Sequence, residues 1–413
     1  MDTVAQAKKI KLASKYINKA KTCVKNNILK SIGESLRENV DLILKQNQKD
    51  LDAARENDMP KHLVDRLMLT QKRIESMALG VFELISLPDP AYQVVWGQTR
   101  PSGLKIEKIQ VPIGVIGVIY ESRPNVSVDV AALCIKSGNA VLLRGGKDAI
   151  HTNTVLVELM QNAIQKNGAD PSIIGLVKKT DRSSALEMMR MRGILDVLIP
   201  RGSAGLIRSV AENSTVPVIE TGVGNCHIYI DQSADIDMAI RITVNAKTSR
   251  PSVCNSAESL LVHKSVAENF LKRLKEEFDK SGVELVGCPR AKQILPEIQI
   301  ASEDDYYAEY LGYKMSVKVV DCVQDAACHI NKYSSGHSEA IVTSDYFSAE
   351  YFLKEVDSAA VYVNASTRFT DGNEFGLGAE IGISTQKLHA RGPMGLADLT
   401  TPKFIIRGDG QIR

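Results

Sequence analysis

The sequence has no strong excess of either charge, and this absence excludes one large class of proteins. Its 413 residues include 51 Lys and Arg and 49 Asp and Glu, a formal net charge of +2. A protein that binds nucleic acid by electrostatics needs surplus cations to neutralise phosphates, so nucleic acid is not an expected partner. The hydrophobic share of 44% and the charged share of 24% are those of an ordinary globular protein.

Long hydrophobic runs are also missing. No uninterrupted apolar run approaches the ~20 residues that a membrane-spanning helix needs, so a membrane is not an expected partner either. The first residues are polar and periodic and lack the apolar core of a secretory signal. The seven cysteines show no disulfide-framework spacing, which suits a reducing compartment. We therefore expect a cytoplasmic protein of roughly two or three domains.

Metal and nucleotide fingerprints are absent as well. Cys322, Cys328 and His329 lack the C-x-x-C pair of a zinc site, so no metal site is predicted. The chain has no G-x-x-x-x-G-K-[ST] loop, and the pair Gly222 and Gly224 lacks the third glycine of G-x-G-x-x-G. These gaps disfavour a P-loop kinase and an ordinary Rossmann dehydrogenase.

What the sequence does contain is a long alternation of strands and helices. A helical region at about residues 4–85 and a hairpin at 94–109 precede an apolar run, 111–120, that suits a strand buried on both faces. Further strands are predicted at 140–143, 174–177, 195–199 and 216–219, and helices at 151–166, 183–191 and 204–211. Alternation with short loops predicts βαβ units and a doubly wound sheet.

The loops after three of these strands are rich in glycine, serine and cations. They span residues 144–148, 178–182 and 200–203. Because ligands of open α/β sheets bind at the carboxyl ends of the strands, a nucleotide is the first ligand to expect there.

A second α/β segment begins after residue 225. It contains predicted strands at 227–230, 259–262 and 360–363 and an amphipathic helix at 266–278. Residues 371–395 are dense in glycine and polar side chains, which predicts a loop region that covers a ligand. Residues 402–407 predict a final strand.

One cysteine lies where chemistry is plausible. Cys254 stands in a polar stretch, residues 245–255, that also carries Lys247 and Arg250. Nearby cations can stabilise a thiolate, and a polar loop can expose it. Arg250 and Lys247 would then hold a substrate phosphate or lower the pKa of the thiol. From the residues alone, a small structural cysteine is the commoner alternative.

Several motifs together resemble the γ-glutamyl phosphate reductases, a family within the aldehyde dehydrogenase superfamily. The motifs lie in collinear order at residues 119–125, 138–146, 218–227, 245–255, 375–382 and 388–396. The resemblance implies an aldehyde-dehydrogenase-like α/β fold, with two doubly wound domains, a small β assembly element and a homo-oligomer. It implies a cofactor-binding domain at 1–225 with an assembly hairpin at about 92–110, a catalytic domain at 226–375, and a return segment with an assembly strand at 376–413.

The same resemblance implies an activity. The family reduces L-glutamyl 5-phosphate with NADPH to L-glutamate 5-semialdehyde and phosphate in proline biosynthesis. Cys254 would form a thioester, and its N–H and the Asn125 amide would stabilise the oxyanion. Glu220 stands where hydrolytic relatives keep the glutamate that activates water. Association with glutamate 5-kinase, which supplies the unstable substrate, is a partnership to test.

The resemblance also suggests where the cofactor and the substrate phosphate bind. The predicted cofactor residues are Arg144, Gly145, Lys147, Ser203 and Gly222, and the predicted phosphate residues are Arg250 and Lys247. Arg144 offers a planar fork suited to the ribose 2′-phosphate that distinguishes NADPH from NADH. Two alternatives stay open: a hydrolytic aldehyde dehydrogenase acting on a small aldehyde, and a non-catalytic nucleotide-binding protein with a structural Cys254.

Overall fold

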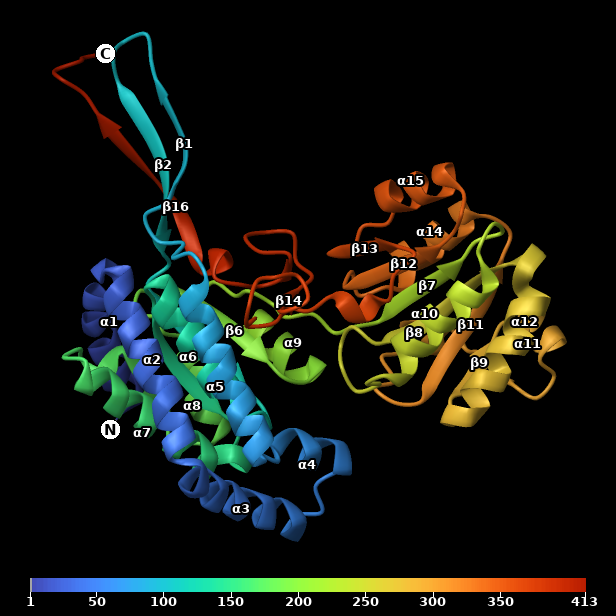
Figure 1. Ribbon diagram of the computed structural model, residues 1–413, viewed down its shortest axis with the longest axis horizontal. Helices are drawn as coiled ribbons and strands as arrows, with labels where there is room; N and C mark the ends of the chain where they lie inside the picture. Colours follow the sequence, from blue (N-terminus) through green and yellow to red (C-terminus); the bar gives the residue numbers. More distant parts are fainter. Residues whose placement is uncertain (1) are drawn as a thin grey trace. The chain divides into compact units, whose positions relative to one another are not determined.

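The computed structural model describes residues 2–413, and their contacts divide them into two compact units (Figure 1). The first unit comprises the chain up to Thr221 together with Gly376–Gly382 and Met394–Arg413. The second comprises Gly222–Phe375 and Ile383–Pro393. Neither unit is one continuous stretch of chain, because the segment after residue 375 contributes to both.

Amphipathic helices form the start of the first unit. They are α1 (Thr3–Lys19), α2 (Thr22–Glu38), α3 (Val40–Glu56), α4 (Lys61–Leu67) and α5 (Gln71–Ser86). Each long helix buries one apolar stripe; in α2 the stripe includes Ile28, Ile32 and Leu36, which are fully buried. The predicted helical region is confirmed.

A parallel sheet in the order β5-β4-β3-β6 forms the centre of this unit. Its strands are β3 (Val115–Tyr120), β4 (Ala140–Gly145), β5 (Ile174–Leu176) and β6 (Val197–Arg201). The helices between and after them are α6 (Asn125–Ser137), α7 (Ile150–Lys166), α8 (Arg182–Met189) and α9 (Ala204–Asn213), with short 3₁₀ turns at Lys147–Ala149 and Pro171–Ile173. Every residue of β3 and β4 is buried, as their continuous apolar runs predict.

Two strand predictions in this unit were wrong in part. The run 111–120 is divided at Gly114, whose φ of +133° favours glycine, so β3 begins only at Val115. The predicted strand at 216–219 is reduced to one bridge between Val218 and Leu198. Pro217 has no N–H to donate, so a regular ladder cannot extend through it.

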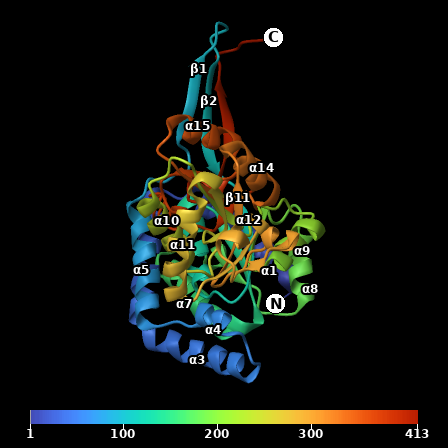
Figure 2. The ribbon, with the colours of Figure 1, turned by 90° about the vertical axis from the view of Figure 1, so that its right-hand side faces the viewer.

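A separate antiparallel sheet projects from the first unit (Figures 1 and 2). Its strands, in spatial order, are β1 (Val94–Thr99), β2 (Lys105–Pro112) and β16 (Thr400–Arg407). β16 pairs with β2 along its whole length, from Thr400 opposite Pro112 to Arg407 opposite Lys105. The predicted hairpin and final strand are confirmed, and they share one sheet.

The second unit is built on a parallel sheet in the order β10-β9-β11-β8-β7-β12-β13. The strands are β7 (Cys226–Ile230), β8 (Ala257–His263), β9 (Glu284–Gly287), β10 (Gln299–Ile300), β11 (Lys314–Val320), β12 (Ser338–Val342) and β13 (Ala360–Val363). The helices are α10 (Ile236–Thr248), α11 (Lys264–Ser281), α12 (Pro289–Ile294), α13 (Glu303–Tyr307), α14 (Val323–Tyr333) and α15 (Tyr346–Glu355).

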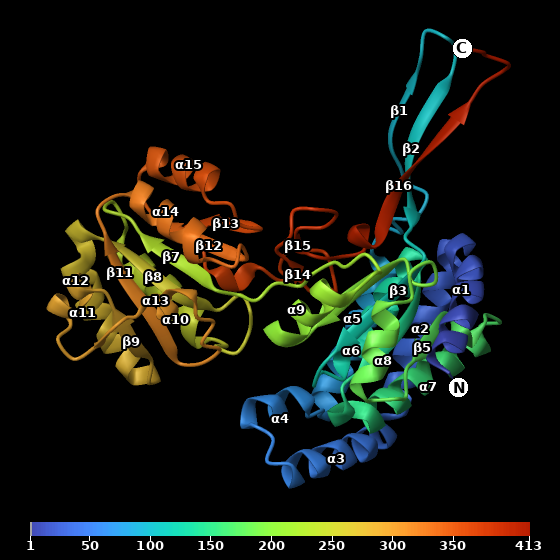
Figure 3. The same ribbon diagram turned by 180° about the vertical axis from the view of Figure 1, so that it is seen from behind.

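Helices cover both faces of this sheet (Figure 3). One apolar core joins the sheet to α10, α11 and α12, and another joins it to α14 and α15. The remaining short elements are β14 (Ile383–Ser384), β15 (Gly392–Pro393) and 3₁₀ turns at Thr367–Phe369 and Ala397–Leu399. Within residues 2–413, no helix is long and apolar enough to cross a membrane.

Candidate active site

In the first unit, the loops that follow β3, β4 and β6 meet at the carboxyl edge of the sheet. The Glu121 carboxylate accepts a hydrogen bond of 2.8 Å from the Ser203 N–H, and Ser203 is the N-cap of α9. Ser122 donates a short hydrogen bond to Asp148. The structure therefore brings the loops of two predicted cofactor residues, Lys147 and Ser203, to one edge, and both residues are exposed there.

Arg144 is almost buried, and the loop after β5 holds its guanidinium. Nη2 donates to the carbonyl oxygens of Thr180 and Asp181 at 2.8 and 2.9 Å, and Nε donates to Ser184 Oγ at 3.4 Å. Contact with a ribose 2′-phosphate would compete with these bonds. In its present position Arg144 fixes the conformation of the connection between β5 and α8.

Gly145 is required by packing. A Cβ there would collide with the amide nitrogen of Asn153 and lie 3.2 Å from the Tyr120 ring. Tyr120 is fully buried and shares a 2.5 Å hydrogen bond with Ser127. The glycine thus lets β4 end close against this buried polar group, and its predicted cofactor contact stays a prediction.

Asn125 is the first residue of α6, and its side chain is oriented by the next turn of the helix. Its Nδ2 donates to Asp129 Oδ2 at 2.9 Å. Burial raises the pKa of Asp129 to about 6, against the opposing effects of Asn125 and of the Arg201 charge. An amide nitrogen carries two hydrogens, so Asn125 can serve Asp129 and still donate to a second acceptor.

Glu220 lies beside the end of β6. Its neighbours fix it there, because Ile219 N–H donates to Leu198 O at 3.0 Å and Thr221 Oγ1 donates to Pro200 O at 2.7 Å. Gly222 belongs to the second unit, where its N–H donates to Ile383 O at 2.8 Å.

Cys254 lies in the turn between α10 and β8, at the amino edge of the second sheet. The thiol residue is partly exposed, whereas Asn255 beside it is buried. The Asn255 side chain donates to Thr370 O at 2.9 Å. The backbone carbonyl of Asn255 accepts a hydrogen bond from Thr367 Oγ1 at 2.7 Å. The loop that carries Cys254 is therefore held by the segment that follows β13.

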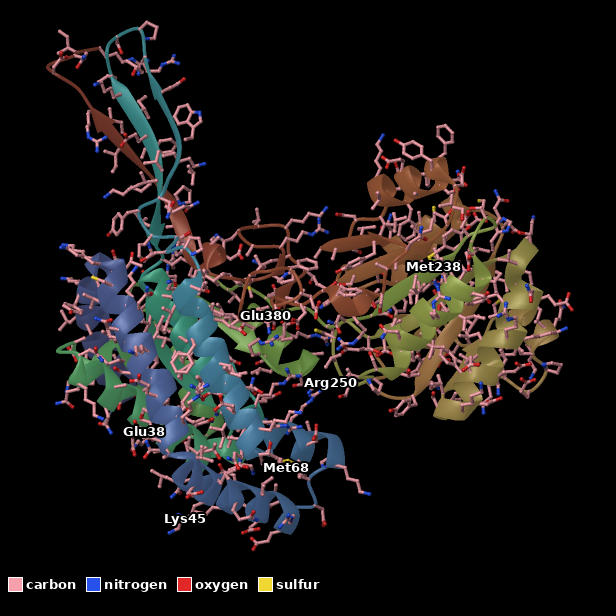
Figure 4. All side chains as sticks on the ribbon, in the orientation of Figure 1. Glu38, Lys45, Met68, Met238, Arg250 and Glu380 are labelled. Atoms are coloured by element: carbon pink, nitrogen blue, oxygen red, sulfur yellow. The ribbon has the colours of Figure 1, made fainter. Side chains whose placement is uncertain are left out.

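The cations near Cys254 differ in accessibility. Arg250 is exposed just beyond α10 (Figure 4). Lys247 is fully buried, and its ammonium forms an ion pair with the buried Glu258. Burial lowers the pKa of Lys247 and raises that of Glu258 to about 7. The ion pair acts in the opposite direction on both pKa values, because each charge stabilises the charged form of its partner. This arrangement fits a structural cation better than a ligand for substrate phosphate.

Comparison with known proteins identifies the fold and its relatives. The family model "Aldehyde dehydrogenase family" matches residues 3–294. The chain belongs to the aldehyde dehydrogenase family. It is 55% identical to the γ-glutamyl phosphate reductase of Carboxydothermus hydrogenoformans and 54% identical to that of Caldanaerobacter subterraneus, with 100% of each chain covered.

A solved structure extends the match to three dimensions. The crystal structure of γ-glutamyl phosphate reductase from Thermotoga maritima covers 100% of both chains with a TM-score of 0.97 and 49% sequence identity. The predicted aldehyde dehydrogenase fold is confirmed, as is the resemblance that pointed to it.

Two residues of this aldehyde dehydrogenase fold were missed by sequence reasoning. Arg368 donates to Asn255 and, through Nε, to Ser249 Oγ at 3.1 Å, so it spans the Cys254 loop. Burial and the neighbouring charge of Arg250 lower the pKa of Arg368, while Asp371 and, less strongly, Cys254 raise it. Cys226 contacts the Cys254 carbonyl from β7. The available signal for Arg368 was weak: a cation five residues beyond a predicted strand.

Across the part of the chain that the structure describes, no group of three or more His, Cys, Asp or Glu side chains is placed to hold a metal ion.

Proposed function

We propose that this member of the aldehyde dehydrogenase family reduces L-glutamyl 5-phosphate to L-glutamate 5-semialdehyde and phosphate with NADPH, as a step of proline biosynthesis. The observation that carries the proposal is the full-length identity of 54–55% to relatives named γ-glutamyl phosphate reductase. The partly exposed Cys254, on a loop held by Asn255 and Arg368, supports it.

Cys254 is the proposed nucleophile. Its thiolate sulfur attacks the acyl carbon, the bond from that carbon to the phosphate oxygen breaks, and phosphate leaves with the electron pair. Attack builds negative charge on the carbonyl oxygen, and the Cys254 N–H and the Asn125 amide are the proposed donors to it. Positive charge on Arg368 and Arg250 favours the thiolate and the departing phosphate.

NADPH, when bound, supplies the hydride that reduces the thioester, after which the Cys254 sulfur leaves and the aldehyde is released. The first unit fits such a dinucleotide at the exposed start of α9, where helical N–H groups and the helix dipole favour a pyrophosphate. Lys147, exposed after β4, adds a cation that we assign to the ribose 2′-phosphate. At the start of α9 the carboxylate of Glu121 opposes an anion, since it already accepts the Ser203 N–H.

Two predicted residues take lesser roles in this proposal. Glu220 positions groups beside β6, because phosphate rather than water is the acyl partner and a general base is less necessary. Lys247 acts through its ion pair with Glu258, which fixes the end of α10 just before the Cys254 loop.

Assembly and location are part of the proposal. The sheet β1-β2-β16 exposes Trp96, Phe404 and Ile406, and we assign it to a homo-oligomer interface. A cytoplasmic location and an association with glutamate 5-kinase remain predictions from the sequence.

The reverse reaction tests the proposal. Purified protein should reduce NADP with glutamate 5-semialdehyde only when phosphate or arsenate is present, because an oxyanion must release the acyl group from Cys254. Equal rates without an oxyanion would show a hydrolytic aldehyde dehydrogenase. NADPH binding with no turnover in either direction would show the non-catalytic alternative.

A further inference from the structure

The chain segment that enters β7 packs against the backbone of Cys254. A Cβ on Gly224 would overlap the carbonyl carbon and oxygen of Cys254 and lie 2.6 Å from its Cα. Two residues later, the sulfur of Cys226 lies 3.2 Å from the same carbonyl oxygen, with the thiol as donor. One short segment therefore contacts the Cys254 carbonyl twice, by close backbone packing and by a hydrogen bond.

Strand register explains this proximity. Cys226 pairs with Ala257, and the pairing then shifts by one residue, so that His227 lies opposite Ser259 and Glu258 is skipped. Cys226 therefore lies beside the start of β8, and β8 begins three residues after Cys254. A register shift next to a functional loop is a common way to redirect side chains.

The segment itself is rigidly held. The Gly224 N–H donates to Glu309 at 2.7 Å. The Asn225 side chain donates to the carbonyl oxygens of Tyr306 and Tyr333 at 2.7 and 2.8 Å. A donor on such a segment keeps its place, so it can fix the group that it contacts.

Cys226 has the protonation state that a donor needs. It is fully buried, and burial raises its pKa well above the ordinary value, with the negative charge of Glu339 adding to the effect. The group stays a thiol and does not compete with the partly exposed Cys254 as a nucleophile. The Nδ1 of His337 lies 3.7 Å from the same sulfur.

We propose that Cys226 is a positioning residue for Cys254: its S–H holds the Cys254 carbonyl and thereby fixes the peptide that joins Cys254 to Asn255. The orientation of that peptide sets the backbone of Cys254, and with it the directions of the nucleophilic sulfur and of the N–H assigned to the oxyanion. The inference rests on the proposed function, in which Cys254 forms the thioester.

Substitutions separate positioning from packing. Cys226→Ala removes the donor, and Cys226→Ser keeps one. Cys288→Ala is the matched control, because Cys288 is another buried cysteine of the second unit, and its sulfur accepts from the Val319 N–H at 3.3 Å. If the alanine variant does not fold, Cys226→Thr and Cys226→Val make the same comparison, since they share a shape and differ in the donor.

The measurements are kcat and KM for semialdehyde oxidation with phosphate, and the pH profile of Cys254 alkylation by iodoacetamide. Cys226→Ala should lower kcat about tenfold, the effect of one modest hydrogen bond, with little change in KM. In the same variant, the pH at which Cys254 alkylation reaches half of its maximal rate should differ from that of wild type. Cys226→Ser should recover most of kcat, and Cys288→Ala should match wild type in both measurements.

Two results would overturn the inference. One is an unchanged kcat and alkylation profile in Cys226→Ala; the other is an equal loss in the alanine and serine variants, which would indicate packing alone. Cys254→Ala, assayed in parallel, tests the proposed function. If Cys254→Ala retains turnover, both the proposed function and the role of Cys226 are wrong. If Cys254→Ala loses turnover while Cys226→Ala keeps it unchanged, only the role of Cys226 is wrong.

Discussion

Cys254 is the residue on which the proposed chemistry depends, and its neighbours fix the loop that carries it. After β13, Arg368 and the Thr370 carbonyl contact Asn255 in this loop, and from β7 Cys226 contacts the Cys254 carbonyl. A nucleophile on an otherwise mobile turn gains a fixed direction from such contacts.

The most direct prediction concerns Cys254→Ala. This variant should lose hydride transfer entirely, because no thioester can form, while it keeps its fold and binds NADPH as wild type does. Semialdehyde-dependent NADP reduction measures the loss. Thermal melting and cofactor titration are the controls, and turnover in a clean preparation of a folded variant would refute the assignment.

A second prediction separates Arg144 from Lys147. Lys147 is exposed after β4, so Lys147→Ala should weaken NADPH binding roughly tenfold and leave NADH little changed, since only NADPH has the 2′-phosphate. Arg144 also braces the loop after β5, so Arg144→Ala should weaken the binding of both cofactors. Titrations of both cofactors against each variant provide the measurement.

The test of Lys147 is the ratio of its effects on NADPH affinity and on NADH affinity. Equal losses for NADPH and NADH in Lys147→Ala would show that this side chain does not distinguish them. Lys166, at the end of α7, gives a control substitution of the same type.

Cys254 was proposed as a site residue from its residue type and its neighbours in the chain, and the structure places it, partly exposed, on a loop held through Asn255. Lys247 shows the limit, because only the fold reveals that Glu258 takes its ammonium. Arg368 and Cys226 act on Cys254 from distant parts of the chain, and local sequence patterns do not contain that information.

At the scale of elements, apolar periodicity predicted most helices and strands of the first unit and, in the second unit, β7, β8, β13 and α11. The errors come from backbone chemistry: Gly114 divides one apolar run, and Pro217 prevents a ladder in another. Strand order and the shifted register between β7 and β8 were beyond prediction, because pairing depends on tertiary contacts.

Helix α14 contributes a buried histidine that makes a pH-dependent prediction possible. His329 packs against Tyr306 and Tyr333, with ring centroids 5.0 and 4.3 Å away, and its Nδ1 lies 3.1 Å from the Lys318 ammonium. Burial lowers the pKa of His329 to about 2, with smaller contributions from the neighbouring His227, Lys318 and Lys332 side chains. The imidazole is therefore neutral in the folded state at ordinary pH.

The sign of the effect follows from linkage. An unfolded histidine takes up a proton near pH 6.5 while the folded one does not, so its contribution to stability is present above that pH and is lost as pH falls, by about 1.4 kcal/mol per unit. His329→Phe should flatten the acid side of a curve of melting temperature against pH. The exposed His151, changed to Gln, is the control, and parallel curves for His329→Phe and wild type would contradict the prediction.

At the scale of the whole molecule, the sheet β1-β2-β16 has a face on which large aromatic side chains are exposed. Trp96 and Phe404 both pair with Lys108, so the three side chains form one row across the sheet. Trp96 is 44% exposed and Phe404 is 56% exposed. Side chains of this size in a row are typical of an interface.

Substitution of this row tests the homo-oligomer. Phe404→Asp should lower the solution mass of the protein at a fixed concentration, as measured by light scattering, because a buried charge weakens an apolar interface. Phe347→Asp, on exposed α15, is the matched control. The same mass for Phe404→Asp and wild type would exclude this face as the interface.

The pairing of β2 with β16 has a consequence for how the protein is made. Glu107 and Arg407, which form an ion pair across that ladder, stand 300 positions apart in the chain. At about 5–20 residues per second, the ribosome needs roughly 15–60 s to reach residue 407 after it has passed residue 107. For that interval the edge of β2 opposite β1 has no strand to pair with, and an unpaired edge can recruit another chain. The nascent protein is therefore prone to edge-to-edge association throughout that interval, and a chaperone that shields this hairpin should raise the yield of folded protein.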